Sequence, residues 1–188
     1  MSKEFDFIAV GDITTDAFIR LEKAEIHTNV DHVAQELCVE FGAKIPYEFV
    51  KVVPAVGNCA NAAVAAARLG LHSALLTNQG DDDIGKEHLR ILKREKVSTD
   101  FVKSHWRQKS NYHYVLWFKD ERTILVRHEK YAYSIPDMGN PKWLYVTSLG
   151  PDTLSFHDDL KNYLAEHKKT KLAFQPGTFQ INLGAEKL

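Results

Sequence analysis

Two aspartates follow directly after the first apolar run of the sequence. Residues 5–10 are almost continuously apolar, as in a buried strand, and Gly11 ends the run before Asp12 and Asp16. Open α/β sheets place their ligands at the carboxyl ends of strands, so both carboxylates are candidate ligand contacts. A carboxylate accepts hydrogen bonds from neighbouring hydroxyls, which favours a sugar contact for Asp16. A turn or cap role is the stronger interpretation for Asp12.

A second candidate site is the turn at Gly57, which precedes an alanine-rich run. Gly57 has no Cβ, so a ligand or another backbone can approach closely, and Asn58 is expected to cap a helix. Alanine favours the helix, and Gly70 is expected to end it in a left-handed conformation. The positive end of the helix dipole would face Gly57, Asn58 and Asn61, which suits a polyhydroxyl or anionic ligand. Alternatively, these small residues only permit tight packing.

Other reactive residues predict no metal site. The aspartates at 81–83 are expected to cap the following helix, since no further ligand stands at calcium-loop spacing. Cys38 and Cys59 form no metal-spaced pair and are expected to stay reduced. The nine histidines are scattered, and we expect them at the surface or lightly buried. No P-loop or dinucleotide-binding glycine motif is present.

The composition is that of an ordinary globular domain. The chain has 188 residues, 26% of them charged, and a formal net charge of −1. This length predicts one domain, and the charge balance argues against a nucleic-acid partner. The sequence has neither a signal-peptide pattern nor an apolar run of about 18 residues, so we expect no membrane partner and a cytoplasmic location.

Strand and helix patterns alternate along much of the chain. Short apolar runs predict strands, and 3.6-residue periodicity or good helix formers predict helices between them. The predicted strands are 5–10, 73–77, 143–147 and 171–175, and the predicted helices include 60–69, 154–167 and 182–188. This alternation predicts a doubly wound α/β fold with a mostly parallel sheet.

Two strand-rich insertions interrupt that pattern, at about 17–53 and 104–130. Residues 18–21 and 47–52 read as strands, and residues 110–128 read as a hairpin that turns at 120–121. Together the insertions predict a small second sheet with aromatic residues on both faces, covering a ligand or a second subunit. The alternative is a long surface hairpin.

Several motifs resemble those of the ribokinase-like (PfkB-type) carbohydrate and nucleoside kinases. Residues 57–63, with 69–70 and 80–85, resemble the family's N-terminal signature, in which a glycine pair and an asparagine bind the sugar; Asn58 replaces the second glycine. Residues 11–16 resemble the family's first substrate-binding segment. Residues 174–178 resemble a strand ending in Asn-Pro, with Gln175 in place of asparagine. The resemblance implies a ribokinase-like fold in which the insertions form a β-sheet lid.

The resemblance also implies an activity and its cofactors. The reaction would transfer the γ-phosphoryl group of ATP, with Mg²⁺, to a hydroxymethyl group of a sugar. The family's second signature, which supplies the catalytic base and an anion hole, has no counterpart in the sequence. We therefore expect a single ribokinase-like domain that is incomplete at its C-terminus and inactive alone. Its catalytic and ATP- and Mg²⁺-binding residues would lie after Leu188, and its partners would be a small-molecule sugar or nucleoside and a second copy bound through the lid.

Two alternatives remain beside the sugar kinase. A nucleoside kinase would stack a base on lid aromatics such as Phe41, Tyr47 or Phe49. A noncatalytic interaction module would keep the fold without the chemistry. The substrate-binding residues predicted for the sugar kinase are Asp12, Asp16, Gly57, Asn58 and Asn61.

Overall fold

The computed structural model describes residues 4–30 and 34–184, and the chain divides into two compact units. The larger unit comprises Met1–Thr15, Pro54–Asn111 and His128–Leu188. The smaller unit comprises Asp16–Val53 and Tyr112–Arg127. The role of the smaller unit as a lid remains a prediction.

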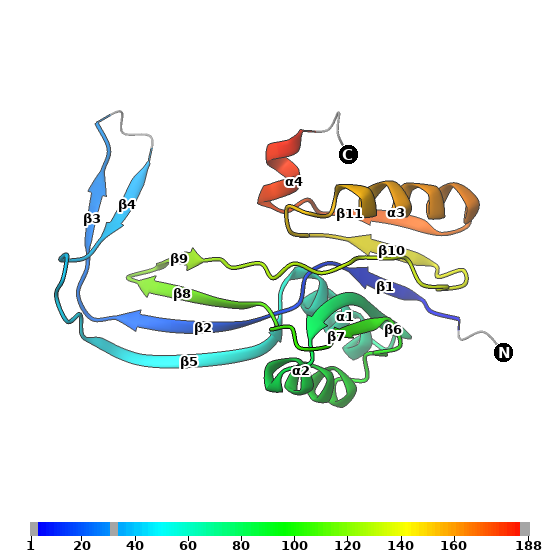
Figure 1. The fold of residues 1–188 in the computed structure, drawn as a ribbon, viewed down its shortest axis with the longest axis horizontal. Helices are drawn as coiled ribbons and strands as arrows, with labels where there is room; N and C mark the ends of the chain where they lie inside the picture. The colour runs from blue at the N-terminus through cyan, green and yellow to red at the C-terminus, as the bar shows by residue number, and fades with distance from the viewer. Residues whose placement is uncertain (1–3, 31–33, 185–188) are drawn as a thin grey trace. The chain divides into compact units, whose positions relative to one another are not determined.

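The larger unit is built on a five-stranded parallel sheet (Figure 1). Its strands lie in the order β11-β10-β1-β6-β7, and each neighbouring pair is parallel. Their bounds are β1 (Phe7–Val10), β6 (Ser73–Gly80), β7 (Val102–His105), β10 (Trp143–Val146) and β11 (Lys171–Phe174). The parallel sheet predicted from the sequence is confirmed, and β11 forms one of its edges.

Helices cover both faces of this sheet. Its helices are α1 (Asn58–Arg68), α2 (Asp83–Arg94), α3 (Leu154–Glu166) and α4 (Thr178–Leu183). On one face, Ile8 of β1 packs in a cluster with Phe156 of α3. On the other, Ala9 packs in a cluster with Cys59 of α1 and Leu92 of α2. Because successive residues of β1 point to opposite faces, the apolar run at 7–10 serves both cores, and the doubly wound fold is confirmed.

The two ends of α1 differ in how well the sequence predicted them. Gly70, with φ 91°, follows the helix, and its N–H and that of Leu71 donate to carbonyls of the last turn, at 3.0 Å each. This is the left-handed ending that was expected. The predicted N-cap was wrong: Gly57 is the N-cap and Asn58 is already helical. Asn58 makes no capping bond, because its side chain donates instead to Ser148, which follows β10.

The last helix lies earlier than predicted. The sequence predicted a helix over 182–188, but α4 occupies Thr178–Leu183 and ends at Gly184, whose φ is 79°. Gln180 fixes the start of α4, since its Oε1 accepts from Gly177 N and its Nε2 donates to Thr147 O, at 2.8 and 3.0 Å. Residues 185–188 of the predicted helix lie outside the described residues.

The smaller unit is a β structure. Its main sheet has the order β5-β2-β8-β9, and a hairpin of β3 and β4 forms a separate two-stranded sheet. The bounds are β2 (Thr14–Leu21), β3 (Glu25–Thr28), β4 (Gln35–Cys38), β5 (Tyr47–Val56), β8 (Tyr112–Phe118) and β9 (Glu121–Leu125). Phe118 pairs with Glu121, so the hairpin turns at Lys119 and Asp120, one residue earlier than predicted.

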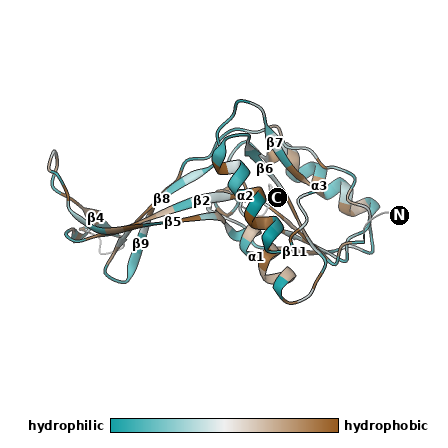
Figure 2. Cartoon of the chain, turned by 90° about the horizontal axis from the view of Figure 1, so that it is seen from below, coloured by the Kyte–Doolittle hydropathy of each residue, from teal (hydrophilic) through white to brown (hydrophobic). Residues whose placement is uncertain are grey.

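Both hydrophilic and hydrophobic residues recur along α2 and α3, as expected for helices with one face on a sheet (Figure 2). Within residues 4–30 and 34–184, no helix is long and apolar enough to span a membrane.

Asp82 caps α2, which confirms the capping interpretation of the three aspartates. Its Oδ1 accepts from Gly85 N at 2.9 Å and from Ser110 Oγ at 2.6 Å, and its Oδ2 accepts from Ser110 N at 2.9 Å. Burial raises the pKa of Asp82, but these hydrogen bonds outweigh burial and leave the pKa below its usual value. The part of the chain that the structure describes has no group of three or more potential metal-binding side chains.

We predict that Asp82→Ala lowers the free energy of unfolding by about 1–3 kcal/mol, because it removes the helix cap and leaves Ser110 without its acceptor. Asp83→Ala is the matched control. The Asp83 side chain is 99% exposed, so its removal should change the free energy of unfolding little. Urea unfolding of both variants measures the difference. Equal stability of the two variants would contradict the capping role.

The same carboxylate should make stability depend on pH. A folded-state pKa below the unfolded value of about 3.9 contributes stability above that pH, and the contribution is lost as pH falls through the folded pKa. The stability difference between the parent and Asp82→Asn should therefore shrink below about pH 4. A difference that stays constant from pH 7 to pH 3 would refute this assignment.

Candidate functional site

Ser148 brings two of the predicted residues together in the larger unit. It follows β10, and its carbonyl accepts from Asp12 N at 3.0 Å. Its hydroxyl accepts from Asn58 Nδ2, also at 3.0 Å. Asp12, Asn58 and Ser148 therefore form one polar group at the carboxyl ends of β1 and β10, where the sheet rule expects a ligand.

Gly57 permits this group to form. Its φ is 105°, and a Cβ there would lie 2.7 Å from Asp12 O, closer than side chains approach a backbone oxygen. Cys59 Sγ donates to the same oxygen at 3.2 Å. Gly11 is similarly crowded, because its Cβ would lie 3.0 Å from Ser148 O and 3.1 Å from Cys59 Cβ. The start of α1 thus lies directly against the end of β1, which requires glycine at both turns.

The carboxylate of Asp12 is already engaged by the protein. Its Oδ1 accepts from the Tyr133 hydroxyl, and its Oδ2 lies 3.3 Å from His128 Nδ1. The Asp12 side chain is only 9% exposed. Burial and the negative charge of Asp12 raise the pKa of Tyr133 far above its usual value. Asp12 therefore anchors the segment between β9 and β10, and it offers less free acceptor capacity than an exposed carboxylate.

Asn61 is exposed on α1 and lies outside the polar group of Asp12, Asn58 and Ser148. Its backbone N–H donates to Gly57 O at 2.9 Å. Its side chain lines a hollow of about 380 Å³ to which Asp12, Asn58 and Ser148 do not contribute. The other residues of that hollow are Ala55, Val64, Ala65, Arg68, Ile91 and Glu95.

Asp16 belongs to the smaller unit, on β2. Its Oδ1 lies 3.5 Å from Nδ1 of His113 on the neighbouring strand β8. The two side chains are 21% and 15% exposed. Asp16 Oδ1 is buried and accepts no hydrogen bond from any residue of the described ranges. A buried carboxylate oxygen in this state is costly unless a donor reaches it, which makes Asp16 the more available of the two aspartates.

His88 contradicts the expectation that the histidines lie at or near the surface. It is fully buried on α2, and burial lowers its pKa to about 4, so the ring is neutral at pH 7. Its Nδ1 lies 3.2 Å from Gln79 Oε1, which can only accept, so Nε2 accepts from Thr15 Oγ1 at 2.8 Å. All the polar atoms of this ring are satisfied, and we assign it a structural role.

Asn111 ties together three places where the chain leaves the larger unit. Its carbonyl accepts from Thr15 N at 3.2 Å, and its Oδ1 accepts from Glu129 N at 2.8 Å. Its Nδ2 donates to Ile13 O at 3.1 Å. No pattern in the sequence indicates this role, because the three partners are distant along the chain.

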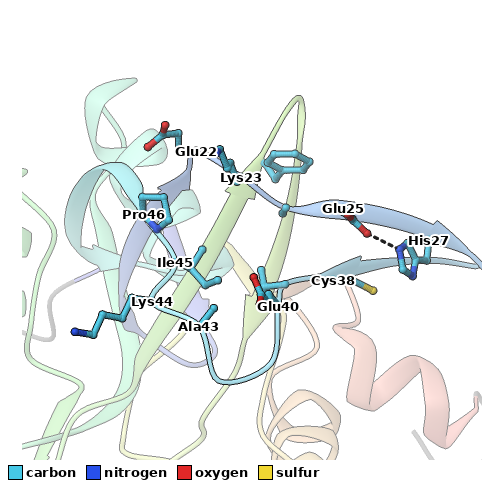
Figure 3. A pocket seen from close by; sticks show the side chains of 13 residues that line it. Glu22, Lys23, Glu25, His27, Cys38, Glu40, Ala43, Lys44, Ile45 and Pro46 are labelled. Atoms are coloured by element: carbon cyan, nitrogen blue, oxygen red, sulfur yellow. Dashed lines mark hydrogen bonds and ion pairs between the residues drawn. The ribbon is translucent and has the colours of Figure 1, made fainter.

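A hollow within the smaller unit contains none of the predicted residues (Figure 3). It measures about 910 Å³ beside β3 and β4. Glu25 Oε2 and His27 Nε2 point toward one another at 2.9 Å, so these two side chains already contact each other. The lining residues are Glu22, Lys23, Ala24, Glu25, His27, Cys38, Val39, Glu40, Ala43, Lys44, Ile45, Pro46 and Phe118. Because most of them are exposed and carry charges of both signs, we do not favour this hollow as the site.

Three residues that contact the predicted ones were not themselves predicted: Ser148 and Tyr133 in the larger unit, and His113 in the smaller unit. Ser148 follows a predicted strand directly, so the strand-end rule that selected Asp12 could have found it. His113 stands on a predicted strand, but its pairing with Asp16 depends on strand order. Tyr133 lies between β9 and β10 in a segment with no periodic pattern, and no sequence signal identifies it.

A comparison with protein-family models finds one family. Residues 46–170 match the family model described as "pfkB family carbohydrate kinase". A search of curated proteins gives no match. Among solved structures, the chain is similar to a nucleoside kinase of Methanocaldococcus jannaschii, with 16% identity and a TM-score of 0.70 over 100% of this chain and 57% of that chain.

Two ribokinases show the same likeness. One, from Arabidopsis thaliana in complex with ribose and ATP, has 15% identity and a TM-score of 0.69 over 92% of this chain and 53% of that one. The other, from Cryptococcus neoformans in complex with ADP, has 21% identity and a TM-score of 0.65 over 91% of this chain and 49% of that one. At these identities the likeness shows a ribokinase-like fold. The chain spans about half the length of these structures.

The two glycines that flank α1 provide a test of the close approach at Gly57. Both have positive φ, so alanine at either costs about 1–2 kcal/mol of backbone strain. A Cβ at Gly70 would meet nothing within 4 Å, whereas at Gly57 it would meet Asp12 O. We predict that Gly57→Ala destabilises the chain clearly more than Gly70→Ala in urea unfolding. An equal loss in both variants would contradict the close approach.

Proposed function

Because the chain belongs to the pfkB family of carbohydrate kinases, we propose that it carries the sugar-binding residues of an ATP-dependent kinase that phosphorylates a hydroxymethyl group. The observation that carries this proposal is the turn at Gly57, which lies within the family match and presses the start of α1 against the end of β1. The positive end of α1 and the polar group around Ser148 suit a polyhydroxyl ligand.

The proposed contacts are the residues that the sequence predicts, and each is argued from its own unit. Asp16 is the main acceptor for sugar hydroxyls, because its buried Oδ1 has no hydrogen bond from the described residues. Gly57, Asn58 and Asn61 contribute from the start of α1. Asp12 is a lesser contact, since Tyr133 and His128 already hold its carboxylate.

ATP is the proposed phosphoryl donor, with Mg²⁺ as its partner ion. Solved structures that the chain resembles are described as complexes with ATP and with ADP, which supports this choice. The described residues do not fit Mg²⁺: they include no cluster of three suitable side chains, and the Asp82 carboxylate is taken up by Ser110 and Gly85. We derive no step through the metal.

We propose that the smaller unit is a lid over the sugar and also mediates a homodimer. Its sheet exposes large apolar side chains that include Tyr47, Phe49, Val50, Val52, Tyr114, Ile124 and Leu125. Such a surface favours burial against a ligand or a second copy. Equal slowing of amide exchange in β8 and α1 on sugar binding would count against the lid, and a monomer mass in sedimentation would count against the dimer.

A cytoplasmic location is part of the proposal, and the two free cysteines, Cys38 and Cys59, suit a reducing compartment.

A nucleoside kinase is the second candidate. Phe49 and Trp117 form an edge-to-face pair, with ring centroids 6.0 Å apart, and Tyr47 is 57% exposed. Aromatic rings of this kind can stack on a base. Comparing ribose with adenosine in calorimetric titrations separates the two candidates.

We predict that the 188-residue chain alone does not transfer phosphate, because its described residues offer no fit for Mg²⁺ and its sequence has no phosphate-binding glycine loop. A coupled assay of ADP release, run with a panel of sugars and nucleosides, measures this. Sugar-dependent turnover at a rate usual for kinases would overturn the prediction.

We predict that Asp16→Ala weakens sugar binding by about 1.5–3 kcal/mol, the scale of a hydrogen bond to a charged group. Titration calorimetry with ribose, fructose and adenosine measures the dissociation constants. Asp120→Ala is the control, because Asp120 is an exposed carboxylate in the same unit. An unchanged dissociation constant for every ligand that binds the parent would remove Asp16 from the site.

A further inference from the structure

The hollow of about 380 Å³ in the larger unit is lined mainly by α1 and α2. Val64, Ala65 and Arg68 line it from α1, at a spacing that places them on one face of the helix. Ile91 and Glu95, four residues apart on one face of α2, line it as well. Small-molecule sites usually measure about 300–1,000 Å³, so this hollow is large enough for a small ligand.

The side chains around this hollow are of two kinds. Val64, Ala65 and Ile91 are apolar, whereas Arg68 and Glu95 are charged. Arg68 Nε donates to Glu95 Oε2 at 2.8 Å. Asn61, which also lines the hollow, precedes Arg68 by about two helical turns. A ligand that fills the hollow beside Arg68 therefore contacts apolar side chains and one ion pair together.

Arg68 has the donors to bind a second acceptor. A guanidinium carries five N–H groups, and within the described ranges of the chain only the Nε group of Arg68 donates to another residue. The Arg68 side chain is 68% exposed, whereas Glu95 is 17% exposed. Two parallel N–H groups of a guanidinium match the two oxygens of a carboxylate. The Nη groups of Arg68 therefore suit a carboxylate ligand.

The charges at this end of the hollow favour an anion. Arg94 lies 3.8 Å from Glu95, so one carboxylate serves two guanidinium groups. Lys93 and Lys96 flank this stretch of the sequence, and α1 contains no acidic residue. The C-terminal ends of α1 and α2 each offset only about half a positive charge. Four cations against one carboxylate thus leave a surplus of positive charge.

We propose that this hollow binds a small organic acid. The carboxylate of the acid pairs with Arg68, and its apolar body packs against Val64, Ala65 and Ile91. Burial of apolar surface and a charge-assisted hydrogen bond then act together, so neither part of the ligand is sufficient by itself. This second ligand site goes beyond the proposed function, because its anchoring residue is none of the proposed sugar contacts.

The test is a series of amide NMR spectra of the chain during titration with benzoate and with hexanoate. Benzyl alcohol supplies an apolar body without the charge, and acetate supplies the charge without the body. We expect benzoate or hexanoate to shift the amide resonances of Val64, Arg68 and Ile91, and to bind at least about fivefold more tightly than benzyl alcohol or acetate.

Two variants at exposed positions of α1 test the two parts of the site separately. Arg68→Gln removes the charge and should weaken binding of the acid about tenfold or more. Ala65→Leu fills the hollow and should weaken it as strongly, with Arg68 still present. Arg90→Gln is the matched control: Arg90 is likewise exposed and ion-paired, with Glu87, but does not line the hollow. Thermal unfolding confirms that each variant is folded.

Several outcomes would overturn the inference. These are no shift with either acid at millimolar concentrations, equal binding of benzyl alcohol, and normal binding by Arg68→Gln or Ala65→Leu. Displacement of the acid by ribose, fructose or adenosine would assign the hollow to the sugar site and would also overturn it. If the acid binds as expected while no sugar or nucleoside binds, the proposed function fails and this inference stands.

Discussion

The arrangement of the candidate site in the larger unit depends on the close contact between the backbone of Asp12 and the turn at Gly57. With 2.7 Å between Asp12 O and a hypothetical Cβ at Gly57, only glycine leaves room for α1 to start there. The contact brings Asn58 to Ser148 and lets Cys59 donate to Asp12 O. The alanines then let α1 lie close to the sheet, where Ala60 and Ala63 are fully buried. The contact between Asp12 and Gly57 thus determines both the packing of α1 against the sheet and the position of Asn58 beside Ser148.

Much of the fold was predictable because its signals are local. The apolar run at 7–10, the alanines of α1, the left-handed Gly70 and the Asp82 cap are each decided by residues close in sequence. The errors arose where distant contacts decide. Asn58 fails to cap α1 because it donates to Ser148, 90 residues away, and α4 starts at Thr178 because Gln180 reaches Thr147. Such contacts override local preference.

The two aspartates of the first turn show the same limit at the candidate site. They stand four residues apart, and the sequence offers the same chemistry for both. The fold separates them: Tyr133, 121 residues along the chain, donates to Asp12, while Asp16 lies beside His113 on β8 with a buried oxygen that no described residue satisfies. Availability to a ligand is therefore a property of tertiary structure, and the contacts with Tyr133 and His113 that decide it could not be predicted from the sequence.

The most direct measurement of a sugar site in this chain is a series of amide NMR spectra recorded during titration with ribose, fructose or adenosine. If the account is right, the ligand that binds shifts the amide resonances of Gly57, Asn58, Asp16 and His113. The resonances of residues beside the large hollow, such as Glu25 and Cys38, should stay in place. Shifts confined to that hollow, or none at saturating ligand, would contradict the account.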